Sequence, residues 1–449
     1  MARTKNIDMT QGPILKELVL FALPLLLGNA FQQLYNTVDS VIVGQFVGSA
    51  SLAAVTSTAM IINTLVGLFV GFSTGSSVII SQFFGAKKDD MLQKAIHTAL
   101  TTTFIMGIIF MIMGYFITPP LLVLMRTDAN VMNPATVYLR IYFMGILGLM
   151  FYNMTSAILR AVGDSVRPLI FLIITSILNI ILDLLFVIGF KMGVAGVAYA
   201  TVISQFVSAF MGMFVLMRSK ENYGVSLQKM HIDPKILRKI FAVGLPAGFQ
   251  MAIISFSNVF VQSYINSFGA NSTAGWGVYG RIDAFVMLPL QSIALANTTF
   301  TGQNAGARNP DRIKQGIRVS LLLAVIITVV ICALEYAAAP YIIRLFTSDE
   351  AVMKFGIIFI RCNCMFDFFC CFNQMHAGVL RGIGDAAAPM VIMIFSFVLF
   401  RQIYLYTITR LTSSIYPVSL SFPVGWIMCS LLMLIYFRLS HWERRISPN

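Results

Sequence analysis

The sequence predicts an all-α polytopic membrane protein with twelve transmembrane helices in two six-helix lobes related by a parallel repeat. Three observations lead to this prediction. Of the 449 residues, 58% are hydrophobic and only 11% are charged, far from the balance of a soluble domain. Long apolar runs recur from about residue 14 to residue 436. The second half of the chain also repeats motifs of the first half at a nearly constant offset.

Each apolar run reaches the length of roughly 18 residues or more that a helix needs to cross a bilayer. The first six runs form a predicted N-lobe, 14–217, and the last six a predicted C-lobe, 236–440. Polar residues 218–235 are the predicted linker, between tails 1–13 and 441–449. The predicted spans are 14–46, 51–80, 92–118, 134–158, 168–190, 194–217, 236–264, 277–302, 315–343, 355–380, 390–410 and 417–440.

The repeat is clearest at residues 159–168, whose Leu, Arg, Gly, Asp and Pro return at residues 380–389, an offset of 221. Residues 82–96 match 303–317 at the same offset, and 14–24 match 236–246 at 222. Each half has an even number of spans, so both enter the membrane in the same direction and a cleft is expected between them. Gly163 suits a positive φ, Asp164 can cap the next helix and Pro168 suits its first turn, so the repeated motif is expected to be a scaffold turn.

The net charge of +13 is distributed unevenly among the loops. If the first span leaves from the cytoplasm, 22 Lys and Arg residues fall on the cytoplasmic side and seven on the other. Positive charge concentrates on the cytoplasmic side of membrane proteins. Both termini are therefore expected in the cytoplasm.

Five acidic residues fall inside apolar runs, where an ionised acid costs about 2.5–3.5 kcal/mol and so needs a partner, water or a proton. They are Asp39, Asp183, Asp283, Glu335 and Asp367. Glu335 is expected near the membrane interface. Asp283 lies two residues from Arg281, which is expected to neutralise it, and Asp367 has no obvious partner in the sequence.

Asp39 and Asp183 both fall in the outer half of spans that start inside. Asn179 shares the helix face of Asp183, and Asn153 and Thr201 come from antiparallel spans at overlapping depths. Carboxylate, amide and hydroxyl oxygens suit a proton or Na⁺, and two carboxylates are too few to demand Ca²⁺. We therefore predict a cation-coupling site in the N-lobe, with no other metal site.

The second half serves as an internal control for this site, because matching positions share a scaffold. The positions matching Asp39, Asp183, Asn179, Thr201 and Asn153 are held by Val261, Tyr404, Phe400, Phe422 and Gln374. A requirement of the scaffold would appear in both halves. The asymmetry favours a functional site over a buried structural network.

Pro24 lies in the same span as Asp39 and is a candidate hinge, the alternative being a static kink. The six cysteines are expected to be packing residues, without a disulfide framework or metal cluster. The sequence contains no His-Glu-x-x-His and no Gly-x-x-x-x-Gly-Lys motif, so an enzyme is not expected, and no cofactor is predicted. The many Met and Phe residues either face lipid or line a cleft that accepts flat cations.

These features together resemble the multidrug and toxic compound extrusion (MATE) transporters over essentially all of residues 14–440. The resemblance rests on the two six-span halves, on Asp39 within residues 35–40, on residues 82–86, on the two Leu-Arg-x-x-Gly-Asp turns, and on Asn179 to Asp183. It implies antiport across a bacterial cytoplasmic membrane, in which drugs or metabolites leave as H⁺ or Na⁺ enters and the lobes rock between V-shaped states. The implied protein acts as a monomer on small organic molecules and binds no nucleic acid.

Within the family the chain is most similar to the DinF-like bacterial branch, whose N-lobe cation site uses acids matching Asp39 and Asp183. Tyr138 is implied as a further neighbour of this site. NorM-like members add acids in the C-lobe, but Ser255 and Cys370 stand about where those acids would fall. In the second half, Asp367, Asp283, Arg281, Gln374 and Arg401 remain secondary candidates.

A flippase for lipid-linked sugars, from the same superfamily, is the nearest alternative function. Such proteins tend to line the cleft with several cations, whereas Arg281 and Arg401 are the only deep ones here. A channel is a further alternative, although nothing in the sequence resembles a selectivity filter. The sequence leaves the substrate and the choice between H⁺ and Na⁺ open.

Overall fold

The structure is a computed structural model that describes residues 7–446, apart from the side chains of residues 49, 50, 52 and 60. The ends of both predicted tails, 1–6 and 447–449, lie outside the described residues. The described chain is helical throughout, with short turns between helices and no strand. The apolar composition of the runs explains this, because in lipid each backbone group must bond within its own helix.

The helices of the first half are α1 (Ile14–Ile42), α2 (Ser49–Gly85), α3 (Asp89–Leu124), α4 (Ala129–Met144), α5 (Ile146–Ala161), α6 (Val166–Asp183) and α7 (Gly193–Arg218), with π-helical turns η1 (Val43–Val47) and η2 (Leu184–Gly189). A short 3₁₀ turn, η3 (Leu227–Lys229), lies in the linker. Those of the second half are α8 (Pro234–Asn266), α9 (Ala270–Val286), α10 (Leu288–Gly306), α11 (Pro310–Arg344), α12 (Glu350–Cys364), α13 (Asp367–Gly382), α14 (Ala387–Ile394), η4 (Phe395–Phe400), α15 (Arg401–Leu411), α16 (Ile415–Ser419), α17 (Ser421–Leu439) and the 3₁₀ turn η5 (Trp442–Arg445).

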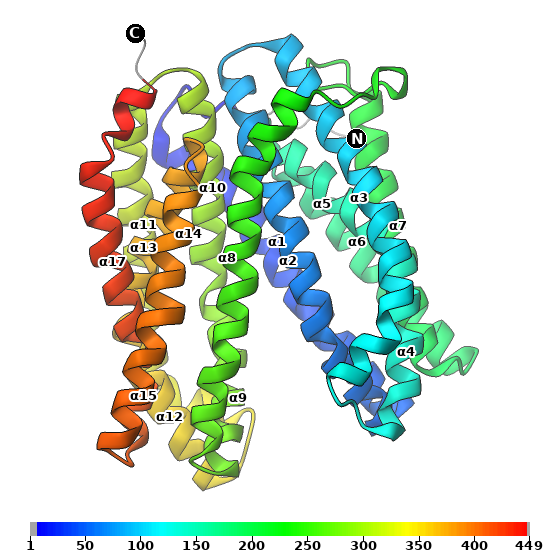
Figure 1. Cartoon of the computed structure of the whole chain (residues 1–449), viewed down its shortest axis with the longest axis vertical. Coiled ribbons are helices and arrows are strands. Elements are labelled where there is room, and N and C mark those ends of the chain that lie inside the picture. The colour runs from blue at the N-terminus through cyan, green and yellow to red at the C-terminus, as the bar shows by residue number, and fades with distance from the viewer. Residues whose placement is uncertain (1–6, 447–449) are drawn as a thin grey trace. The chain divides into compact units, whose positions relative to one another are not determined.

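The twelve predicted spans correspond to these helices taken singly or in consecutive groups (Figure 1). Within the described residues, nine helical segments are long and apolar enough to cross a membrane, and two bent pairs raise the number to eleven. The pairs are α4 with α5, bent by 48°, and α12 with α13, bent by 51°. The remaining pair, α9 with α10, occupies the place of the predicted eighth span, and its Asn and Thr residues lower its hydropathy.

The repeated turns have the predicted local structure. Gly163 has a φ of +91° and Gly384 a φ of +96°, so both adopt the left-handed conformation that glycine accepts most easily. Asp164 Oδ1 accepts from the backbone N–H groups of Val166 and Arg167, both at 3.1 Å, and so caps α6. Burial raises the pKa of the Asp164 carboxyl, while these bonds and the Arg167 guanidinium oppose that rise.

The chain forms two compact units whose borders lie inside helices α1 and α8. The first unit contains residues 23–244 with residues 7–8, and the second contains residues 9–22 with residues 245–446. Each border falls one residue before a proline, Pro24 or Pro246, and these two prolines occupy matching places in the repeat. The predicted lobes, 14–217 and 236–440, differ at these borders. They place the start of α1 in the N-lobe and the start of α8 in the C-lobe, whereas the compact units place the start of α1 in the second unit and the start of α8 in the first.

Close packing explains why the opening turns of α8 belong to the first unit. A Cβ added to Gly75 of α2 would lie 2.6 Å from the backbone nitrogen of Gly244 in α8, so only glycine fits there. On the other side, the Met9 backbone N–H donates to Gln303 Oε1 at 3.0 Å and its carbonyl accepts from Asn304 Nδ2 at 3.1 Å. These bonds hold the stretch before α1 on the second unit.

Candidate functional site

Asp39 and Asp183 meet inside the first unit, as the sequence predicts. Asp39 lies near the end of α1 and is half-buried, and Asp183 is the last residue of α6 and fully buried. Their carboxyl groups are in direct hydrogen-bonding contact. Among the described residues, no ion pair joins either acid to a basic side chain. Two ionised carboxylates repel each other at this range, so the contact requires a shared proton or a bound cation.

Asn179 and Thr201 complete a polar network around Asp183. With its amide oriented to satisfy its neighbours, Asn179 Nδ2 donates to Asp183 Oδ2 at 3.0 Å and Asn179 Oδ1 accepts from the Thr201 backbone N–H at 3.2 Å. Asp39 Oδ1, Asp183 Oδ1 and Thr201 Oγ1 are buried without a hydrogen-bond donor from the described protein atoms. These three oxygens are therefore available to a small cation or a proton.

Tyr35 is a member of this network that the sequence analysis did not select. Its hydroxyl lies close to the Thr201 side chain, and the residue lies beside Asp39. Tyr35 precedes Asp39 by four residues, so the two side chains share a helix face, and this spacing alone indicates that Tyr35 lies near Asp39. Tyr138 of α4 lies near Asp39 and stacks on Tyr142, with ring centroids 6.3 Å apart.

Two π-helical turns, η1 and η2, lie next to the acids. Asp183 immediately precedes η2, and Asp39 lies four residues before η1. A π-helical turn widens the helix and shifts its carbonyl groups, and such turns are frequent at functional sites. Apolar side chains from η1, η2, α4 and α7 pack together here, among them Val43, Val187 and Val197. The acids therefore lie in a polar cluster with apolar surroundings, which strengthen their electrostatic interactions.

Three other predicted residues are not brought into an acid site. The Asn153 amide donates to the Leu149 carbonyl of its own helix at 2.9 Å. Gln374 is half-buried on α13. Arg281 is exposed and forms no ion pair with Asp283 among the described residues, so the expected local neutralisation is wrong. Residues two apart on a helix point to different faces.

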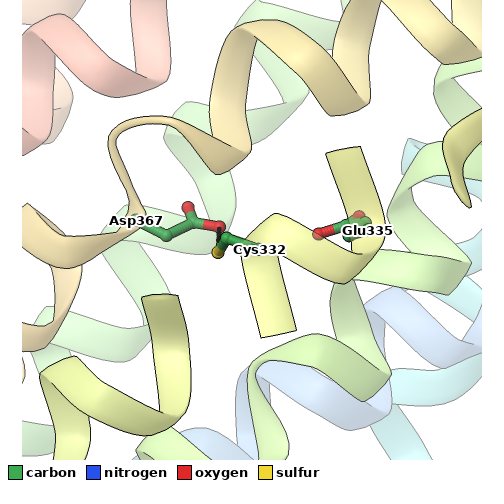
Figure 2. A group of neighbouring side chains, drawn as sticks. All are labelled: Cys332, Glu335 and Asp367. Carbon is green, nitrogen blue, oxygen red and sulfur yellow. Dashed lines mark hydrogen bonds between the residues drawn. The ribbon is translucent and has the colours of Figure 1, made fainter. Parts of the chain in front are cut away.

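The second unit gathers acids that the sequence left apart. Glu335 of α11 and Asp367 of α13 lie together with Cys332, one helical turn before Glu335 (Figure 2). Asp283 of α9 is nearby and accepts from the Tyr279 hydroxyl at 3.3 Å. Only 5% of Glu335 is exposed in this cluster, while its depth near the membrane interface stays a prediction. Cys332 is not simply a packing residue, because its thiol donates to Asp367 Oδ2 at 3.4 Å.

Arg401, at the start of α15, is a buried basic residue of this unit. Its Nη2 donates to Ser257 Oγ at 3.0 Å and to Asn258 Oδ1 at 2.8 Å, and its guanidinium lies 4.7 Å from the centre of the Phe422 ring. Only 2% of the residue is exposed, and its Nε is buried without an acceptor from the described protein atoms. Its hydrogen-bond partners among the described residues are neutral side chains, so the Arg401 guanidinium is able to bind an anionic group.

Helices in two repeated units, with buried acids inside the apolar spans, define a polytopic membrane protein of the transporter class. The family model for MatE matches residues 24–185 and again residues 246–407. The chain belongs to the MatE family, and the double match confirms the repeat that the sequence predicts.

Similar proteins agree with this assignment over nearly the whole chain. "Probable multidrug resistance protein YpnP" of Bacillus subtilis is 31% identical over 445 residues, covering 98% of each chain. Two solved structures, described as MATE in the straight and in the bent conformation, are each 25% identical. Their TM-scores are 0.92 and 0.89, with 98% of this chain covered and 99% and 97% of theirs.

Proposed function

We propose that this chain is a secondary antiporter that exports organic, often cationic, drugs or metabolites in exchange for H⁺ or Na⁺ by alternating access. The observation that carries the proposal is the contact between the Asp39 and Asp183 carboxyl groups. Its relatives named as multidrug resistance proteins support small organic substrates. We propose that the protein acts as a monomer in a bacterial cytoplasmic membrane. Both termini are proposed to lie inside, in keeping with the distribution of Lys and Arg.

Competition for the acid pair is the proposed coupling step. With the pair deprotonated, its negative charge favours a cationic substrate. Uptake of H⁺ or Na⁺ from outside then neutralises the pair and lowers the affinity for that substrate. Each inward charge releases about 2.3 kcal/mol per 100 mV of membrane potential, so the gradient can drive export. The Asn179 amide and the free oxygen of Thr201 are suited to hold the incoming cation beside Asp183.

Pro24 is the proposed hinge that converts this chemistry into movement. It lies at the border where α1 passes from the second unit to the first, and α1 carries Asp39 further along. Proline has no backbone N–H and weakens the helix at that point. The two similar solved structures, described as MATE in the straight and in the bent conformation, support such a movement.

Transport by the purified full-length protein in proteoliposomes tests the proposal. Efflux of a fluorescent organic cation is compared under an imposed pH gradient and an imposed Na⁺ gradient. Wild-type efflux should respond to one of them, and Asp39→Asn and Asp183→Asn should abolish that response while the protein remains folded and inserted. Asp283→Asn, an acid of the second unit, is the matched control and should still respond. Unimpaired, gradient-driven efflux by both N-lobe variants would contradict the proposal.

Arg401 is the observation that favours the second candidate function, a flippase for lipid-linked sugars or other lipids. Its buried guanidinium with neutral partners suits the phosphate of such a lipid. A rhodamine methyl ester and the corresponding free acid help to separate the two functions. They differ by one carboxylate, so a comparison of the two dyes shows whether the protein prefers a cationic substrate or one with a negative group. Export of the ester under a cation gradient supports the antiporter. Gradient-independent movement of a phosphate-bearing fluorescent lipid, lost in Arg401→Gln and kept in Arg410→Gln, would support the flippase.

A further inference from the structure

Cys332, Glu335 and Asp367 present three ligand atoms to one point inside the second unit. One sulfur and two carboxylate oxygens all lie within 4.8 Å of one another. Figure 2 shows the Cys332 and Asp367 side chains directed toward each other, with the Glu335 carboxylate beside them. Cys332 and Glu335 share a face of α11 because they are three residues apart. Asp367 begins α13, directly after the break at which the path of α12 and α13 bends by 51°.

The cluster contains a buried carboxylate oxygen that its protein neighbours do not satisfy. Asp367 is 2% exposed, and its Oδ1 is buried without a donor from the described protein atoms. Within residues 7–446, neither Asp367 nor Glu335 forms an ion pair with a basic side chain. A buried charge without a partner is costly. The cluster is therefore a place for a positive ion rather than a self-sufficient structural network.

The identity of the ligand atoms selects the kind of ion. A thiolate favours soft or borderline metals such as zinc, whereas Na⁺ and Mg²⁺ prefer oxygen alone. With Zn–S near 2.3 Å and Zn–O near 2.0 Å, a tetrahedral site has a sulfur-to-oxygen edge of about 3.5 Å. The Cys332 Sγ lies 3.4 Å from Asp367 Oδ2, so these two atoms already have the required separation.

A cavity beside Cys332 provides a route to the cluster. It has a volume of about 370 Å³, and its walls include Thr328, Cys332, Tyr336, Cys364 and Met365. Two further sulfur-containing side chains, Cys364 and Met365, therefore line the approach to the Cys332 thiol. The cavity also leaves room for a water molecule as a fourth ligand.

We propose that the second unit contains a binding site for a thiophilic divalent cation of the Zn²⁺ class, ligated by Cys332 Sγ and by the Glu335 and Asp367 carboxylates. The site bridges α11 and the break between α12 and α13. It is separate from the N-lobe acid pair and does not depend on the antiport proposed above. It also differs from the C-lobe pattern of NorM-like relatives, whose expected acid positions are held here by Ser255 and Cys370.

Metal binding to the purified full-length protein tests the site without any transport measurement. Cd²⁺ is the optical probe, because a cadmium–thiolate bond gives an ultraviolet charge-transfer band, and Zn²⁺ affinity is measured by competition with a chromogenic chelator. Wild type should bind one metal per chain and show the band. Cys332→Ser should lose the band, and both Cys332→Ser and Asp367→Asn should bind Zn²⁺ at least tenfold more weakly.

Cys429→Ser is the matched control, because Cys429 is fully buried on α17 and outside the cluster. It should keep both the band and the affinity. Size-exclusion profiles and helical content identify any variant that fails to fold, and Glu335→Gln then serves as the replacement. A folded wild type without a cadmium–thiolate band, or a Cys332→Ser variant that binds as wild type does, would overturn the proposal.

Discussion

Pro24→Ala is the most direct test of how α1 acts. Proline inside a helix removes one backbone hydrogen bond and brings its ring against the preceding turn, at a cost of about 3 kcal/mol or more. Alanine at this position restores the bond and favours a regular, straight helix. A change of that size corresponds to a population ratio shifted by about 150-fold. If a bent state is a step of transport, the variant should seldom reach it.

The length of α1 beyond Pro24 sets the size of the movement. Asp39 lies fifteen residues further along the helix, which is about 22 Å at 1.5 Å per residue. Each 10° of bending at Pro24 therefore moves Asp39 by about 4 Å relative to the first turns of α1. This exceeds the reach of a hydrogen bond, so even a small bend is enough to separate Asp39 from Asp183.

The repeat supplies a matched control for this variant. Pro246 lies at the same register of α8, at the other border between the units, and α8 carries no acidic residue. In proteoliposomes, Pro24→Ala should reduce gradient-driven efflux at least tenfold. The ratio of the substrate Kd measured with the coupling cation to the Kd measured without it should fall close to one. Pro246→Ala should keep the cation dependence of Kd. Normal efflux and normal cation dependence in Pro24→Ala would refute the hinge.

Three further variants probe the site and the packing of the units. Asn179→Leu removes the amide donor to a buried carboxyl, worth about 1–3 kcal/mol, and should change the affinity for the coupling cation at least fivefold in a binding titration. Gly75→Val forces the backbones of α2 and α8 apart and should lower the Tm by several degrees, whereas Gly277→Ala, which meets open space, should leave it unchanged. Arg312→Gln removes bonds to the carbonyl oxygens of Met9 (3.1 Å) and the two loop residues 11 and 12 (2.6 and 2.9 Å), and should speed proteolytic cleavage before α1.

Much of the architecture follows from composition and the repeat. Apolar run length predicts the spans, and Gly163 and Asp164 predict a turn that the structure reproduces. The helix breaks at Gly145 and Phe366 were missed, although they match each other at the offset of 221. A short bend inside an apolar run changes neither hydropathy nor length, so composition carries no sign of it. The assignment of residues 9–22 to the second unit depends on long-range bonds that no local pattern shows.

The two candidate sites differ in how far the sequence could predict them. Asp39 and Asp183 stood out because the repeat provides a comparison position for each. The cluster around Glu335 and Asp367 comes from two different helices whose facing sides are set by packing alone. Their sequence separation has no helical periodicity, so only the structure brings them together.

The matching positions of the two halves also show how one scaffold holds buried charge of either sign. Ser257, which bonds to Arg401, corresponds to Tyr35, and Arg401 lies one turn from the position that corresponds to Asp183. A π-helical turn adjoins the charge in both cases, η2 after Asp183 and η4 before Arg401. Such a turn disturbs the regular backbone bonding, so a charged side chain there can be met by polar groups instead of lipid. The scaffold therefore determines where a charge is tolerated, while the side chains of each half determine whether a cation or an anion is attracted.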